Sequence, residues 1–156
     1  MSGNGKVAET TREIAERHGA RPELLIQILH DVQASLGFVP DDAVVTLART
    51  LNLSRAEVHG VVSFYHDFRR QAPGRHVVKI CQAEACQAMG SRALTQHAER
   101  TLGVRLHESN DDVTLEPVYC LGNCACAPAA MIDGRTFGRV SAERFDALVE
   151  ELGEDS

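Results

Sequence analysis

Cys81-Gln-Ala-Glu-Ala-Cys86 and Cys120-Leu-Gly-Asn-Cys124 are the two stretches around which the chain is organised, and a fifth cysteine, Cys126, follows the second pair. Thiolates are soft ligands that select zinc, Cu(I) or iron-sulfur clusters, so four thiols in two close pairs predict a metal site. Disulfides are disfavoured, because the cysteine count is odd and the N-terminus lacks the apolar segment of a secretory signal.

The spacing within the two pairs helps to separate the candidate metals. Four residues lie between Cys81 and Cys86, and three lie between Cys120 and Cys124. Structural zinc sites usually take their ligands from tight knuckles, whereas a binuclear cluster needs a loop that wraps a larger object. Plant-type ferredoxins also leave a gap of about four residues in their first pair. The spacing therefore favours a 2Fe-2S cluster, with zinc as the alternative.

Composition bounds the class of protein. The chain has 156 residues, of which 44% are hydrophobic, so it can form one medium domain or two small ones with a packed core. A net charge of -6, an aromatic content of 4% and the absence of Trp argue against a nucleic-acid partner. No apolar run reaches the length of a membrane span, so we expect a cytoplasmic protein without membrane insertion.

The first half of the chain has the apolar spacing of amphipathic helices. We predict four helices that share a core, over residues 8–18, 22–36, a segment capped by Asp41, and 54–63. Ser54-Arg-Ala-Glu57 is a capping-box pattern that opens the fourth helix, and residues 1–7 are expected to be frayed.

The pattern changes at Pro73-Gly74, where we place a boundary between domains 1–72 and 73–156. The second domain is predicted to have the order β-α-β-β-β-α, which makes the whole chain an α+β protein with an all-helical N-terminal domain. Its predicted elements are strands 76–80 and 114–119, helix 88–102, a hairpin of 129–132 and 136–140 around Asp133-Gly134, and a last helix after Ser141.

The first two predicted strands deliver Cys81 and Cys120 at their carboxyl ends. Because α/β sheets commonly bind ligands at that edge, we expect both cysteine pairs to converge there. A 2Fe-2S core with four thiolates has a net charge of about -2, so backbone N–H groups should turn toward the sulfurs.

Three further motifs lead to a family. They are Ile28-Leu-His30-Asp-Val-Gln33-Ala-Ser-Leu-Gly37-Phe-Val-Pro40, Val58-His-Gly60-Val-Val-Ser-Phe64-Tyr65, and Cys120-Leu-Gly-x-Cys124-x-x-Ala127-Pro128. From residue 12 onward, the chain resembles the thioredoxin-like 2Fe-2S subunit (the complex I 24 kDa type) of NADH dehydrogenases, NAD-reducing hydrogenases and NAD-dependent formate dehydrogenases. The resemblance implies a thioredoxin-like second domain and one 2Fe-2S cluster on Cys81, Cys86, Cys120 and Cys124.

Two segments look most like the gamma subunit of NAD-dependent formate dehydrogenases, namely residues 59–68 and 81–90. This implies an electron-transfer subunit of a multi-subunit oxidoreductase, beside a flavin/NAD-binding subunit and a molybdenum-containing catalytic subunit. FMN, NAD and the molybdenum cofactor are then expected on those partners. A respiratory NADH dehydrogenase or an NAD-reducing hydrogenase is the alternative within the family, and a zinc-stabilised interaction module is the alternative outside it.

No motif in the chain predicts catalytic residues, because it contains no Ser-His-Asp set, P-loop or G-x-G-x-x-G pattern. We interpret His30 and His59 as core or boundary residues, since four cysteines already complete a site. Phe64, Tyr65 and Phe68 fit either internal packing or a partner surface. The N-terminal helices are predicted to dock a partner.

Overall fold

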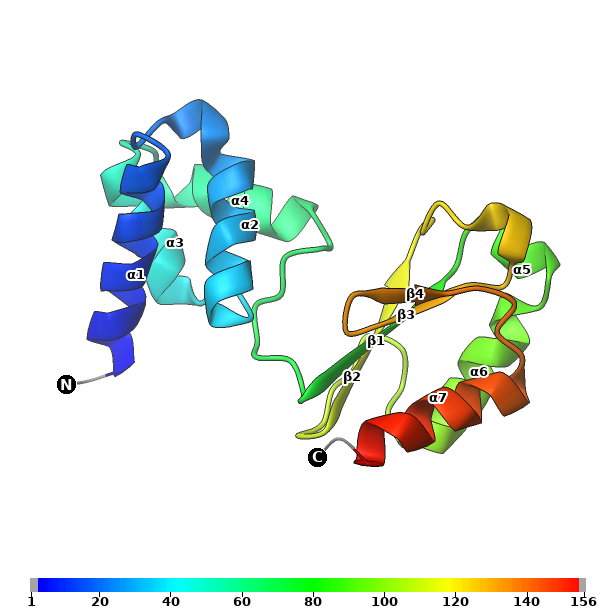
Figure 1. Ribbon diagram of the computed structural model, residues 1–156. Coiled ribbons are helices and arrows are strands. Elements are labelled where there is room, and N and C mark those ends of the chain that lie inside the picture. Colours follow the sequence, from blue (N-terminus) through cyan, green and yellow to red (C-terminus); the bar gives the residue numbers. More distant parts are fainter. Residues whose placement is uncertain (1–2, 155–156) are drawn as a thin grey trace. The chain divides into compact units, whose positions relative to one another are not determined.

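The computed structural model describes residues 3–154, with side chains over residues 5–153. The chain forms two compact units that meet between Ala72 and Pro73, and Figure 1 shows the helices of the first and the sheet of the second. Within the described residues, no helix combines the length and the apolar character needed to cross a lipid bilayer.

The first unit is entirely helical. Its elements are α1 (Gly3–Arg17), the 3-10 turn η1 (Pro22–Leu24), α2 (Leu25–Leu36), α3 (Asp41–Thr50) and α4 (Arg55–Phe64). The amphipathic spacing decides what is buried, because α2 turns Leu25, Ile28, Leu29 and Val32 into the core while the residues between them face outward. Side chains from α1, α3 and α4 complete that core, among them Ile14, Leu47 and Val58.

Helix starts in this unit differ in part from the prediction. Helix α1 begins at Gly3 rather than at Ala8, because Val7 packs against the core and holds the first turns in place. Residues 1 and 2 of the stretch expected to be frayed lie outside the described range. Asp41 is the first residue of α3 and not its cap, a position where its carboxylate still favours the helix dipole. The Ser54–Glu57 capping box is confirmed at the start of α4.

The second unit is a four-stranded sheet with helices. Its strands are β1 (His76–Cys81), β2 (Val113–Val118), β3 (Ala130–Ile132) and β4 (Arg135–Phe137) in the order β2-β1-β3-β4. Strands β1 and β2 are parallel, and the other neighbouring pairs are antiparallel. Its helices are α5 (Glu84–Ala88), α6 (Ser91–Leu102) and α7 (Ala142–Glu154), and η2 (Cys124–Cys126) is a 3-10 turn.

Helices α6 and α7 lie side by side and pack against the sheet (Figure 1). The fully buried ring of Phe145 on α7 meets Val78 and Ile80 of β1 and Leu94 of α6 in one core. The predicted α+β class is confirmed by this mixture of helix and sheet.

One predicted helix is wrong in its extent. We expected a single helix over 88–102, but the structure has α5 and α6 separated by Met89 and Gly90. Gly90 has a φ of 95°, a left-handed conformation that favours glycine, so the chain turns there and a second helix starts. The element order is therefore β-α-α-β-β-β-α, and the hairpin strands are shorter than predicted.

Candidate metal centre

The parallel pair β1 and β2 brings the first cysteine of each motif to one edge of the sheet. Cys81 is the last residue of β1 and is paired with Val118, the last residue of β2. Cys120 follows Val118 by two residues. Parallel strands end at the same edge, so the two cysteine motifs begin next to each other.

Short helical turns carry the second cysteine of each motif. Cys86 lies in α5, and Cys124 is the first residue of η2. The sequence did not predict α5, although the alanines at positions 83, 85 and 88 are a usable signal because alanine is the strongest helix former. The turn matters because it folds the first motif back toward the strand end.

The Sγ atoms of Cys120 and Cys124 lie 3.8 Å apart. Two thiolates on one tetrahedral metal, with metal–sulfur bonds of about 2.3 Å, are separated by about 3.8 Å. The backbone N–H of Gly122 donates a hydrogen bond to Cys120 Sγ at 3.4 Å. Positive φ angles at Cys120 (102°) and Gly122 (71°) bend the loop into this arrangement. The second pair is therefore shaped for a single metal ion.

The two pairs differ in their exposure. Cys81 and Cys86 are each 2% exposed and pack with Ala127 and Ala129 in a small apolar cluster. Cys120 and Cys124 are exposed. The site is thus closed on the side of the first pair and open to the surface on the side of the second.

Backbone N–H groups converge on the Cys81 sulfur. Burial raises the pKa of its thiol, but hydrogen bonds from the backbone at Ala83, Cys120 and Leu121 and from the Cys86 side chain outweigh that effect. The pKa of Cys81 therefore lies below its ordinary value. Two of these backbone groups belong to the second motif, so they show directly that the two motifs meet at Cys81.

The remaining pKa directions report the same proximity. The pKa of Cys86 is raised by burial first, then by its hydrogen bond with Cys81 and by the charges of Cys81 and Cys124. The pKa of Cys124 is raised by its hydrogen bond with Cys120, by the charge of Cys120 and by that of Cys81. Neighbouring thiolates repel one another, so a positive metal ion among them would stabilise the charged forms.

The cysteines are arranged as pairs and not as one tight group. Over residues 5–153, no three His, Cys, Asp or Glu side chains are gathered as a single ion would require. A binuclear cluster fits this donor set, because each of its irons takes two thiolates. The all-thiolate chemistry and the N–H groups aimed at sulfur fit the same cofactor.

A strap formed by Gly138, Arg139 and Val140 braces the second motif. The N–H of Arg139 donates to the Cys126 carbonyl at 2.6 Å, and the N–H of Val140 donates to the Pro128 carbonyl at 2.9 Å. A Cβ atom on Gly138 would lie 2.6 Å from Asn123 Nδ2 and 2.6 Å from Cys126 Cβ. Sequence reasoning missed this strap, because a glycine between a strand and a helix carries no signal of what packs against it.

The histidine prediction is wrong in its burial. His30 and His59 are both exposed. His30 falls outside the buried stripe of α2 and packs its ring 4.9 Å from the ring of Phe68. His59 forms hydrogen bonds with Ser63 and Arg70 on the surface of the helical unit.

Comparison with known proteins gives a family and several relatives. A family described as thioredoxin-like [2Fe-2S] ferredoxin matches residues 11–153. The E chain of the NADH-quinone oxidoreductase of Pseudomonas aeruginosa is 37% identical over 127 residues, which cover 80% of this chain and 76% of the relative. The corresponding protein of Escherichia coli K12 is 35% identical over 127 residues, with the same coverage of 80% and 76%. A further relative of the same name, from Rhizobium meliloti, is 33% identical over 146 residues, or 92% of this chain and 87% of the relative.

A solved structure has the same fold over most of the chain. It is an NAD+-reducing [NiFe]-hydrogenase in the air-oxidized state, with a TM-score of 0.72 and 26% identity over 85% of this chain. This chain spans only 23% of the hydrogenase chain that it matches, so the likeness concerns one part of a larger polypeptide.

Proposed function

Since this chain belongs to the thioredoxin-like [2Fe-2S] ferredoxin family, we propose that it is an electron-transfer subunit of an NAD-linked oxidoreductase complex. We assign Cys81, Cys86, Cys120 and Cys124 as the ligands of its single 2Fe-2S cluster. The observation that carries the assignment is the meeting of the two cysteine pairs at the shared end of β1 and β2. The chain itself contributes no catalytic residue in this proposal.

The residues around the cysteines have separable tasks. When bound, a 2Fe-2S cluster takes up and releases one electron at a time. Ala127 and Ala129 exclude water from the Cys81 and Cys86 side, and the N–H groups at Ala83 and Leu121 offset negative charge at Cys81. The N–H of Cys81 donates to the Ala129 carbonyl at 3.0 Å and fixes the ligand to that wall.

The exposed pair gives the direction of electron exchange. Cys120 and Cys124 lie at the surface, and the neighbouring Tyr119 is 68% exposed. No charged residue occurs between Glu116 and Asp133 in a chain that is 24% charged. A partner cofactor can therefore approach this side without desolvating a charged side chain.

The relatives favour one parent complex over another. The sequence predicted the gamma subunit of an NAD-dependent formate dehydrogenase with a molybdenum-containing partner. The relatives from Pseudomonas aeruginosa and Escherichia coli belong to NADH-quinone oxidoreductases, and the solved structure is an NAD+-reducing hydrogenase. These comparisons favour the alternative, so we assign the chain to an NADH dehydrogenase-type complex, beside a flavin/NAD-binding chain.

The cluster is tested on anaerobically purified protein. We expect a reddish-brown protein with about two irons and two sulfides per chain and visible absorbance that bleaches with dithionite. A colourless protein with one zinc per chain would contradict the proposal.

The parent complex is tested by the partners that copurify from the source cells. A flavin-containing chain together with quinone-reducing activity supports the NADH dehydrogenase assignment. Copurification with a molybdenum-containing subunit and formate oxidation would return the assignment to formate dehydrogenase. The purified chain alone is expected to show no NADH oxidation.

A further inference from the structure

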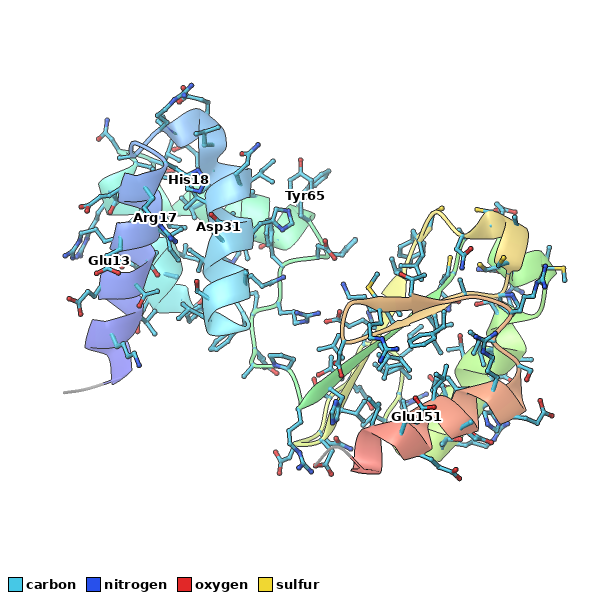
Figure 2. The ribbon with its side chains drawn as sticks, in the orientation of Figure 1. Glu13, Arg17, His18, Asp31, Tyr65 and Glu151 are labelled. Carbon is cyan, nitrogen blue, oxygen red and sulfur yellow. The ribbon has the colours of Figure 1, made fainter. Side chains whose placement is uncertain are left out.

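Helix α4 covers the core with a narrow stripe and leaves most of its surface exposed. Only Val58 and Val62 of its residues are buried. At its end, Phe64 is 75% exposed and Tyr65 is 42% exposed, and their rings are in edge contact with centroids 5.1 Å apart. Figure 2 shows Tyr65 at the periphery of the helical unit, pointing away from it. Large apolar side chains exposed together usually mark an interaction surface.

An apolar groove runs along one side of α4. Its volume is about 570 Å³, and its walls include Leu25, Leu53, Val61 and Phe64. Glu57 is the one charged residue that lines it, and the carboxylate of Glu57 is already engaged in the capping box with Ser54. The groove therefore suits apolar side chains of a partner.

Gly60 lies in the floor of this groove, in the interior of α4. Glycine inside a helix is destabilising relative to alanine, so its presence needs a reason. A Cβ atom at Gly60 would meet nothing within 4 Å, and its backbone does not have a positive φ. The fold of this chain thus does not require glycine at position 60. Ala56, one turn earlier, also lines the groove, and the two small residues leave room for another backbone to pass close to α4.

The other side of α4 has a cationic pocket of about 390 Å³, which also reaches Ala56. Arg55, His59 and Arg70 line it, and Arg70 bonds to Asp41 at 2.6 Å and to His59 Nε2 at 3.2 Å. Arg55 has no hydrogen bond or ion pair with any residue of the described range 5–153. Two guanidinium groups against one carboxylate leave a positive pocket in a chain whose net charge is -6.

We propose that this face of α4, defined by Arg55, Ala56, Gly60, Phe64 and Tyr65, binds an amphipathic helix of the flavin/NAD-binding partner chain. The apolar side chains of that helix fill the groove, its backbone crosses α4 at Ala56 and Gly60, and a carboxylate at its edge pairs with Arg55. Charge complementarity selects this occupant, since a purely apolar segment would leave Arg55 unsatisfied at the rim. The identity of the partner rests on the proposed function, whereas the face and its chemistry rest on the helical unit alone.

The test measures the affinity of the full-length, cluster-loaded chain for the purified flavin/NAD-binding subunit. Phe64→Ala and Gly60→Leu are each expected to weaken binding roughly 30-fold, the size of a central interface residue. Arg55→Glu should weaken binding and also reduce its dependence on salt, because the lost contact is ionic. Matched controls are Ala34→Leu on the exposed side of α2 and Arg12→Glu on α1, both outside the two pockets, which should bind as the unmodified chain does.

Gly60→Leu separates docking from folding. Leucine is a better helix former than glycine and meets open space, so the thermal unfolding temperature should rise while the affinity falls. A variant that lost stability together with affinity would instead indicate a structural role for Gly60 and would overturn the proposal.

Three other outcomes contradict the proposal in distinguishable ways. Unchanged affinity in all three variants would remove α4 from the interface and leave the proposed function intact. A homodimer that dissociates in Phe64→Ala would show that a second copy of this chain occupies the groove. If the cluster-loaded chain did not bind the flavin/NAD-binding subunit at all, both the proposed partner and this interface would be wrong, although the iron and sulfide assay would still stand.

Discussion

At the residue scale, the five cysteines are distinguished by their surroundings. Cys126 is partly buried, its side chain lies against the site of Gly138, and its carbonyl accepts the N–H of Arg139. Four thiolates satisfy a 2Fe-2S core, so a fifth has no coordination position left. Cys126 therefore acts as a small apolar side chain in the brace of the second motif.

Cys126→Ala is expected to retain the visible spectrum of the cluster, because alanine keeps the Cβ atom that packs near Gly138. Cys124→Ala should lose the cluster or leave it labile, since one iron loses a thiolate. Electron paramagnetic resonance of the two reduced variants makes the comparison. Loss of the native signal in Cys126→Ala, with retention in Cys124→Ala, would reverse the assignment of ligand and brace.

Gly138→Ala tests the strap at the same scale. The added methyl group would lie 2.6 Å from Cys126 Cβ and 2.9 Å from the Cys126 carbonyl oxygen, so the ligand loop must shift. We expect a loss of about 2 kcal/mol in unfolding free energy, typical of overpacking, and an altered resonance signal of the reduced cluster. Gly153→Ala, where a Cβ atom meets nothing within 4 Å, is the control. A variant with an unchanged signal and unchanged stability would show that the strap does not position the loop.

At the scale of elements, helix ends decide where the functional parts lie. Gly90 separates α5 from α6, so the turn that holds Cys86 is independent of the longer helix. The start of α4 is set by reciprocal hydrogen bonds between Ser54 and Glu57, at 2.8 Å and 3.1 Å. Since α4 has few buried residues, its cap contributes a large part of its local stability.

Ser54→Ala should lower the unfolding free energy by about 1 kcal/mol, the usual effect of losing an N-cap. Ser35→Ala on the exposed surface of α2 is the control, and it should leave stability unchanged. Chemical denaturation measures both variants. Equal stability of the two would show that the cap does not hold α4.

The same cap predicts a pH dependence. The backbone hydrogen bond from Ser54, and then the hydrogen bond with its side chain, hold the pKa of Glu57 below its ordinary value. A lowered pKa means that the stabilisation is present at neutral pH and is lost as the pH falls through the lowered value, below about pH 4. Glu57→Gln should therefore show a smaller decrease in stability on acidification than the unmodified chain. An identical acid dependence would contradict this.

At the scale of the whole molecule, each unit has a hydrophobic core of its own. The core of the first unit centres on α2, and that of the second on β1, α6 and α7. All four proposed ligands lie in the second unit, and the α4 face lies in the first. The architecture thus separates holding the cluster from contacting a partner through α4.

A chain that begins at Pro73 is expected to fold and to keep its cluster, because its core needs no residue of the helical unit. It should bind the flavin/NAD-binding subunit at least tenfold more weakly than the full chain, since it lacks the α4 face. Iron content, the visible spectrum and a binding titration test the two parts separately. Unchanged affinity would show that the helices only stabilise the protein.

The sequence by itself determined the features that depend on local pattern. Apolar spacing predicted the helices of the first half, Ser54 and Glu57 predicted the cap of α4, and alternation with turn residues predicted the strands. The type and spacing of the cysteines predicted a 2Fe-2S cluster, which the family confirms, and their assignment as its ligands stays a prediction. Residue type, spacing and helix or strand period are properties of neighbours along the chain, and these can be inferred without knowing the fold.

Only the tertiary structure decided which surfaces are covered. Phe64 and Phe68 belong to one short aromatic motif, yet Phe64 is 75% exposed and Phe68 is 5% exposed because the ring of His30 on α2 packs against the latter. The strap at Gly138 likewise meets Asn123 and Cys126 across a gap of more than ten residues. Contacts between distant segments depend on how helices and strands pack together, and local sequence preferences do not encode that packing.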